Sequence, residues 1–352
     1  MKRRRKTKAC SLALLLLLLP HAHASAQGSG DKPAPKPTGR LVDVGGYRLH
    51  LDCEGSRGPA VVLIAGAGDF SFDWSLVEPR ASRFAQVCSY DRAGLAWSDL
   101  GPTPRTMRQD AYELHLLLAN AGVKPPYVLV GHSIGGLIAR VYAERYPSEV
   151  AGLVLVDSTT EDTTLNYQGK VVRVRDSARG VRVPEVHTLA ESPPQPPTED
   201  DLKQAEMNRQ VFGPPKIEPP FDRLPRAARG LRLWALSNQK LSAAGEDFWA
   251  DELREMHEAR EREPRPLGGL PLVVIAAGRS EPAPPGVAAE EWRRLRDEKR
   301  RQQEALAGLS SAGVLRVAAR SGHHVQLEEP ALVVEAIRQV VHSARLRAGR
   351  KR

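Results

Sequence analysis

The sequence predicts an α/β protein whose mainly parallel, doubly wound sheet of eight strands carries helices on both faces. Two observations support this fold class. Short apolar runs of strand length alternate along most of the chain with longer stretches in which apolar residues recur at helical spacing. This alternation is typical of parallel sheets whose strands are joined by helical crossovers. Several of the short runs are also apolar without interruption, as expected for strands that are covered on both faces.

Six of the eight strands are predicted within residues 41–156. A β-hairpin is expected over 41–51, because two strand-like runs are separated there by Gly45 and Gly46. A helix is expected over 106–120, where Leu114, Leu117 and Leu118 share one face. The other elements predicted here are strands at 61–64, 87–90, 127–130 and 153–156 and a helix at 135–146.

The last two strands of the sheet are predicted to follow a long insertion. Its elements are strands at 272–276 and 314–317 and helices near 288–308 and 331–344, so the core is expected to comprise residues 41–157 and 271–344. Residues 158–270 are too many for a simple connection, and they predict a cap inserted after the sixth strand. Proline is frequent in 192–225, which indicates either stiff irregular segments or a partly disordered insertion without function.

The N-terminus has the pattern of a secretory signal. Six basic residues within 1–8 precede an apolar run of 11 residues at 9–19, which is shorter than the roughly 20 residues of a membrane-spanning helix. Small residues at 24–26 then provide a cleavage site. We expect residues 1–26 to be removed and the mature chain to be secreted or to remain in the periplasm or cell envelope. The alternative is an uncleaved anchor. Residues 27–40 predict a flexible leader.

The formal charge of +9 arises mostly at the two ends of the chain. Of the 51 basic residues, six lie in the predicted signal and five lie in 345–352, which is predicted to be a basic tail after the last helix. The part between these ends is close to neutral, and this argues against binding to nucleic acid. The tail is expected to give a weak attraction to an anionic envelope surface.

The remaining polar and sulfur-containing residues predict little chemistry of their own. Cys53 and Cys88 remain after the predicted cleavage, and they form either a disulfide or two buried thiols. No clustered spacing of Cys and His predicts a metal site, and no cofactor is expected. Asp69 and Asp73, on the loop after the strand at 61–64, are expected to act as turn formers or caps.

The chemistry is predicted at residues 131–135, which read Gly-His-Ser-Ile-Gly. Because this motif lies directly between a predicted strand and a predicted helix, Ser133 is expected on a sharp turn where a side chain at either glycine would clash. The helix behind it directs free N–H groups toward a developing oxyanion. A serine hydroxyl also needs a base. Residues 322–324, Gly-His-His, follow the last predicted strand and supply histidines in the appropriate chain order.

With these motifs, the chain from residue 41 to about 344 resembles the α/β-hydrolase superfamily, specifically its capped serine hydrolases with a GHSxG elbow. Residues 90–98 (YDRAGLAWS) look like the DxxGxGxS loop of that family, with Ala96 in place of a glycine. Residues 322–323 followed by 327–330 (LEEP) look like its histidine loop. The resemblance implies that His323, directly after the glycine, is the base. His324 is the alternative.

The resemblance also implies where the oxyanion hole lies. In the family, one donor is the backbone N–H just after a His-Gly turn that follows the third strand. Here this turn reads Ala65-Gly66-Ala67, so the histidine is missing, but a main-chain donor does not need a particular side chain. The implied donors are the backbone N–H groups of Ala67 and Ile134.

Two residues compete for the role of the triad acid, which holds the imidazole in its productive tautomer. Glu281 follows the strand at 272–276 at the spacing where many members of the resembled family carry an aspartate, whereas Asp157 ends the strand at 153–156, a position that other members use. Glu281 begins a proline-rich loop, and it is a glutamate where the resembled family has an aspartate. Asp157 is therefore the favoured acid and Glu281 the alternative.

Together these features predict an exported serine hydrolase that cleaves carboxylic ester-type bonds through an acyl-enzyme intermediate, as esterases and lipases do. The expected substrate is a small-molecule or lipid-like acyl compound. Serine at the elbow disfavours the chemistry of haloalkane dehalogenases and epoxide hydrolases. These enzymes have the resembled fold but use an aspartate nucleophile at this position. The alternatives on the same fold are a C–C bond hydrolase, a lactonase, an acyltransferase, or a hydrolase-like binding protein without turnover.

Overall fold

The computed structural model describes residues 34–167, 170–194, 198–199, 203, 207, 213–238, 250–279, 282–283 and 287–350. The predicted signal at 1–26 and residues 27–33 of the predicted leader lie outside these residues. Within the described part of the chain, none of the helices has the length and apolar character needed to cross a membrane.

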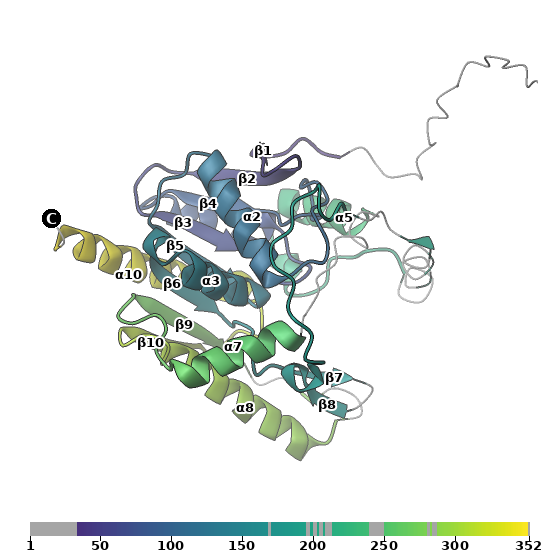
Figure 1. Ribbon diagram of the computed structural model, residues 1–352, viewed down its shortest axis with the longest axis vertical. Coiled ribbons are helices and arrows are strands. Elements are labelled where there is room, and N and C mark those ends of the chain that lie inside the picture. The colour runs from purple at the N-terminus through teal and green to yellow at the C-terminus, as the bar shows by residue number, and fades with distance from the viewer. Residues whose placement is uncertain are drawn as a thin grey trace, which may run out of the picture. The chain divides into compact units, whose positions relative to one another are not determined.

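The core is an eight-stranded sheet in the order β1-β2-β4-β3-β5-β6-β9-β10 (Figure 1). β1 pairs with β2, and β2 with β4, in antiparallel fashion, and every other neighbouring pair is parallel. The strands are β1 (Arg40–Asp43), β2 (Arg48–Glu54), β3 (Ala60–Ile64), β4 (Val87–Tyr90), β5 (Tyr127–His132), β6 (Val150–Val156), β9 (Leu272–Ala277) and β10 (Gly313–Ala318). The predicted fold class is therefore confirmed.

Helices cover both faces of this sheet. They are α1 (Glu78–Ala81), α2 (Met107–Asn120), α3 (Ile134–Arg145), α8 (Ala289–Ala307), α9 (Val325–Glu328) and α10 (Pro330–Gly349), with short 3-10 turns η1 (Ser71–Trp74) and η2 (Pro147–Glu149). Val62 and Leu129 pack in one apolar cluster with α2 and α3, whereas their neighbours Val61 and Val128 pack in another with α1 and α10. This alternation places the sheet between two helical layers (Figure 1). The parallel pairing of β3, β5, β6 and β9 brings their carboxyl ends to one edge.

The insertion between β6 and β9 contains a hairpin as well as helices. Its elements are β7 (Thr164–Tyr167), β8 (Lys170–Arg173), the 3-10 turns η3 (Val174–Ser177) and η4 (Phe221–Arg223), and the helices α5 (Arg226–Leu236) and α7 (Ala250–Arg262). β7 and β8 pair in antiparallel fashion as a separate two-stranded sheet, which the sequence pattern did not predict. Much of the proline-rich stretch at 192–225 lies outside the described residues.

The predicted end of the last helix is wrong. Helix α10 continues to Gly349, so most of residues 345–352 extend the helix and do not form a tail beyond it. Arg345 donates to the backbone oxygens of Gly58 (3.1 Å) and Phe84 (2.7 Å), and Arg347 donates to that of Gly269. Basic side chains are favourable in a last helical turn, and here they also satisfy carbonyl groups of the core.

The two cysteines that the sequence left open form a disulfide. Cys53 on β2 and Cys88 on β4 are directly paired across the antiparallel strands and are joined by a bond between their sulfur atoms. Their Cα atoms lie 4.1 Å apart. The bond ties the antiparallel edge of the sheet to the strand next to the central β3.

Candidate active site

Ser133 lies on a strained turn between β5 and α3. Its backbone has φ 53° and ψ −124°, a region that residues with side chains rarely adopt. A Cβ atom on Gly131 would lie 2.3 Å from the backbone oxygen of Gly135, and one on Gly135 would lie 2.3 Å from that of Ile64. The two glycines therefore permit the turn that projects Ser133 from the carboxyl end of the sheet.

The Ser133 hydroxyl opens into a cavity of about 290 Å³. Asp157 and His323 line the same cavity, together with residues of the insertion and of α8 that include Thr160, Val171, Trp292 and Leu295. In this structure the Ser133 Oγ atom lies 3.3 Å from Thr159 Oγ1. The serine, a histidine and a carboxylate thus meet in one hollow at the end of the sheet.

Asp157 and His323 form a short hydrogen bond. His323, in the loop between β10 and α9, places its Nδ1 atom 2.6 Å from Asp157 Oδ2. Asp157 directly follows β6 and is buried, and its other oxygen accepts a hydrogen bond from the backbone N–H of Ala277 at 3.0 Å. Because Nδ1 is engaged by the carboxylate, Nε2 is the ring nitrogen left for proton exchange in the cavity.

Lys299 of α8 is a second partner of this carboxylate. Its Nζ atom lies 2.6 Å from the same Oδ2 atom that His323 contacts. Burial acts to raise the pKa of Asp157, but the hydrogen bond from His323 and the charge of Lys299 hold that pKa well below its usual range. Burial lowers the pKa of His323 to about 4, against the opposing effect of its bond to Asp157. At neutral pH the pair is therefore a carboxylate and a neutral imidazole.

The turn after β3, residues 65–69, lies against the elbow and is here named the oxyanion loop. A Cβ atom on Gly66 would lie 3.1 Å from Ser133 Cβ, so the loop approaches the serine closely. Arg92, buried within the predicted loop at 90–98, donates to the backbone oxygens of Ala65 (2.6 Å) and Gly66 (2.9 Å). Ala67 belongs to this loop, and Ile134 is the first residue of α3, so both backbone N–H groups come from segments beside Ser133.

The alternative base, His324, does not join this arrangement. His324 points toward Asp69, with Nε2 3.7 Å from Asp69 Oδ2, and its ring packs edge-on against Phe221 at 4.7 Å. His323 is thus the histidine of this pair that meets Asp157. Glu281 lies outside the described residues, so the structure shows only the Asp157 alternative.

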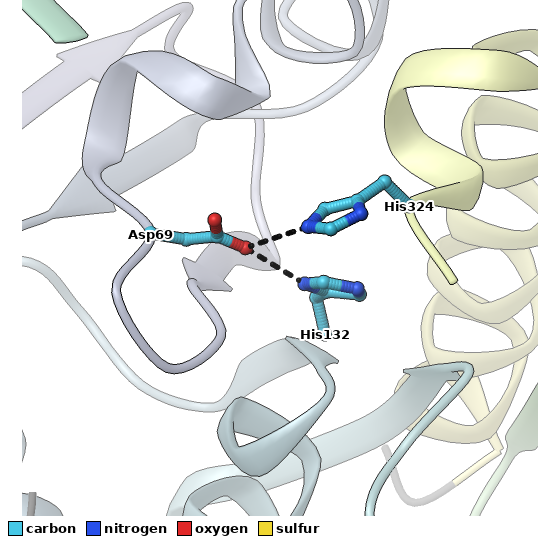
Figure 2. A group of neighbouring side chains, drawn as sticks. All are labelled: Asp69, His132 and His324. Carbon is cyan, nitrogen blue, oxygen red and sulfur yellow. Dashed lines mark hydrogen bonds and ion pairs between the residues drawn. The ribbon is translucent and has the colours of Figure 1, made fainter. Parts of the chain in front are cut away.

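A second polar cluster lies beside the elbow, where Asp69, His132 and His324 converge (Figure 2). Their ligand-type atoms all lie within 4.8 Å of one another. His132 Nδ1 is 3.1 Å from Asp69 Oδ2, which is a hydrogen-bond distance. Arg232 of α5 contacts Asp69 Oδ1 at 3.4 Å, so a cationic side chain already faces this carboxylate. The contacts are those of a hydrogen-bonded charge cluster.

The expectation that Asp69 and Asp73 act only as turn formers is incomplete. Asp73 does cap η1, because it accepts a hydrogen bond from the Phe70 N–H at 2.9 Å. Both carboxylates are nevertheless buried, and both contact Arg232 from the insertion. Arg232, Lys299, Arg92 and Thr159 were all missed by sequence reasoning, since no local pattern marks them.

Comparison with known proteins shows which chains this one is similar to. A family model described as "Alpha/beta hydrolase family" matches residues 61–336. The chain is 36% identical over 131 residues to "Probable transporter efuK" of Hormonema carpetanum, which covers 35% of this chain and 19% of that protein. It is 34% identical over 109 residues to the "AB hydrolase superfamily protein" of Gibberella zeae, covering 30% and 34%. The chain spans less than half the length of the curated relatives it matches.

Solved structures share the same architecture. A thermophilic esterase from Thermogutta terrifontis superposes with a TM-score of 0.56 and 21% sequence identity, covering 85% of this chain and 94% of that one. At this identity the likeness shows the fold alone.

Proposed function

The chain belongs to the alpha/beta hydrolase family, and from this premise we propose that it is a serine hydrolase that cleaves carboxylic ester-type bonds. One observation carries the proposal: the hydrogen bond of 2.6 Å between Asp157 and His323 lies in the same cavity as Ser133, which occupies a strained strand-to-helix turn. Strain at a solvent-accessible serine, with a neutral histidine oriented by a buried carboxylate, is the arrangement that nucleophilic acyl transfer needs.

The proposed reaction has two steps. Ser133 Oγ attacks the ester carbonyl carbon while His323 Nε2 takes its proton, and the N–H groups of Ala67 and Ile134 bind the resulting oxyanion. The tetrahedral intermediate collapses as the imidazolium gives its proton to the departing alcohol, which leaves an acyl-serine. Water, deprotonated by His323, then attacks this ester, and the acid is released as Ser133 regains its proton. Asp157 stays ionised throughout and stabilises the imidazolium.

The cavity supports a small-molecule or lipid-like acyl substrate. Its volume of about 290 Å³ and its mixture of threonine hydroxyls with Val171, Trp292 and Leu295 suit a ligand with one apolar and one polar part. The serine nucleophile disfavours the activities of this fold that use an aspartate, and ester hydrolysis is the activity proposed among those that use a serine.

A fluorophosphonate probe tests the proposal directly. The purified protein is expected to form a covalent phosphonyl adduct at about one equivalent, located by mass spectrometry on the peptide that contains Ser133, because only an activated serine reacts with this probe. Heat-unfolded protein is the control for labelling that does not depend on the fold. Failure of the native protein to label, where a known serine esterase labels, would reject catalysis and favour a binding protein.

We also propose that the chain acts outside the cytoplasm. The disulfide between Cys53 and Cys88 supports this, because such bonds persist mainly in oxidising compartments. The basic and apolar pattern of residues 1–26 is the second support. Protein recovered from the envelope or medium of an expressing bacterium is expected to begin near Gln27 on N-terminal sequencing. An N-terminus at Met1 or Lys2 would count against a cleaved signal.

A further inference from the structure

His132, the residue before the nucleophile, links three segments that the proposed chemistry uses. Its ring is buried, with Nδ1 3.1 Å from Asp69 Oδ2 on the oxyanion loop. Its Nε2 atom is 3.0 Å from the backbone oxygen of His323, in the segment 321–324 that is here named the base loop. His132 itself is the last residue of β5. One imidazole thus joins the elbow to both neighbouring loops; its contact with Asp69 is drawn in Figure 2.

The partners of His132 define its protonation state. A backbone carbonyl oxygen only accepts hydrogen bonds, so Nε2 must carry a proton to bond that of His323. A neutral imidazole with a proton on Nε2 would then direct the lone pair of Nδ1 at a carboxylate oxygen 3.1 Å away, which is repulsive. The contact is attractive only if a second proton lies between Nδ1 and Asp69.

That second proton belongs to the histidine and not to the carboxyl group. Burial acts against ionisation of Asp69, but its hydrogen bond with His132 and the nearby imidazole of His324 hold the pKa of Asp69 far below its usual range. Arg232 faces the other oxygen of the same carboxylate at 3.4 Å, which also favours the ionised form. Asp69 is therefore a carboxylate, and the bridging proton resides on Nδ1.

We propose that His132 is a positioning residue, held as an imidazolium with a proton on each nitrogen, that fastens the oxyanion loop and the base loop to the nucleophile elbow. Its catalytic consequence rests on the function proposed above, whereas its protonation state does not. Charge-assisted hydrogen bonds are stronger and shorter than neutral ones, so the imidazolium fixes both loops more firmly than a neutral ring.

The charges around His132 are consistent with this state. Asp69 contacts it directly, Arg232 pairs with both Asp69 and Asp73, and His323 and His324 have ring centroids 4.6 and 5.0 Å away. Burial and the neighbouring Asp69 carboxylate raise the pKa of Asp73. The positive charge of His132 also contributes, after burial, to the lowered pKa of His323, about 4. The imidazolium therefore helps to keep the base neutral.

Nitrogen-15 NMR of the histidine side chains tests the protonation state without reference to turnover. At pH 7.5 the His132 signals, assigned by their absence from His132→Gln, are expected to show a bonded proton on both nitrogens. Asp69→Asn is expected to change this, because the new side-chain amide can donate to Nδ1 and satisfy a neutral ring that is protonated on Nε2 alone. Asp73→Asn is the matched control, since Asp73 shares Arg232 but does not contact His132, and it should leave both protons in place.

Kinetics then test the consequence. The assay uses an ester substrate whose product is read at its isosbestic wavelength. For the wild type, the fall of kcat/KM at acid pH, here called the acid limb, is expected below pH 6, because His323 remains neutral down to its lowered pKa. In Asp69→Asn the limb is expected to move up by about one pH unit, with kcat reduced about tenfold and KM little changed. A residue that only stabilised the fold would alter the unfolding temperature and leave the limb in place.

Three results would overturn the inference. The first is a wild-type His132 with a single protonated nitrogen. The second is release of the Nδ1 proton on titration with one equivalent of Zn²⁺, which would make the cluster a metal site. The third is an unchanged acid limb in folded Asp69→Asn. If the protein fails to label with fluorophosphonate but His132 is doubly protonated, the proposed function fails and the assigned protonation state stands, so the two failures are distinguishable.

Discussion

Replacing Ser133 by alanine is expected to lower kcat/KM for p-nitrophenyl acetate by about 10⁵- to 10⁶-fold, to the level that binding and the oxyanion donors give without a nucleophile. The hydroxyl is the atom that becomes acylated in the proposed reaction, and no other hydroxyl of the described cavity lies at the strained turn before α3. Because alanine is smaller than serine and tolerates the same surroundings, the unfolding temperature should change by only a few degrees.

Initial rates measured at equal concentrations of folded protein provide the comparison. Ser82→Ala is a suitable control, because Ser82 caps the end of α1 and does not line the cavity, and its turnover should equal that of the wild type. If Ser133→Ala keeps more than about one tenth of the wild-type rate, another group performs the chemistry and the proposed mechanism is wrong.

The sheet and the elbow were predictable because their signals are local. The strand runs at 61–64 and 127–130 are apolar throughout and became the buried central strands β3 and β5. The motif at 131–135 could be recognised as an elbow because a predicted strand directly precedes it and a predicted helix directly follows it. Both signals are carried by residues close in sequence, which a pattern records directly, although the strands themselves pair across distant segments, as Val61 does with Val128.

The partners of the site were harder to predict because they come from distant segments. Lys299 and Asp157 are 142 residues apart, and Arg232 and Asp69 are 163 residues apart. Nothing in the charged run at 290–304 distinguishes Lys299 from its neighbours, and a buried Arg232 looks like any basic residue on an amphipathic helix. Such pairs are set by how the insertion and α8 pack on the sheet, which composition and periodicity do not encode.

His132 illustrates an intermediate case. Its position in the motif was evident from the sequence, but its contribution depends on Asp69 and on the backbone of His323, 63 and 191 residues away. Ala65 occupies the position where the resembled family has a histidine. Arg92, through the backbone oxygens of Ala65 and Gly66, and His132, through Asp69, both hold this loop.

The choice of triad acid predicts the second large effect. Asp157→Asn is expected to lower kcat by about 10⁴-fold, because the asparagine amide can donate to Nδ1 and would stabilise the tautomer whose Nε2 proton blocks base catalysis. The change also removes the counter-charge for the imidazolium and leaves Lys299, 2.6 Å from Oδ2 in the wild type, without its carboxylate. KM should change little, since the Asp157 side chain is buried and already hydrogen-bonded to His323.

Glu281→Gln is the matched substitution, a carboxylate changed to its amide at the competing position, and kcat should stay within about threefold of wild type. Both variants are measured with the same ester at pH 7.5, with circular dichroism to establish that each is folded. A loss of several orders of magnitude in Glu281→Gln alongside an active Asp157→Asn would reassign the acid to Glu281. The hydrogen bond between Asp157 and His323 would then be a structural contact, since a triad acid acts only through the proton on Nδ1.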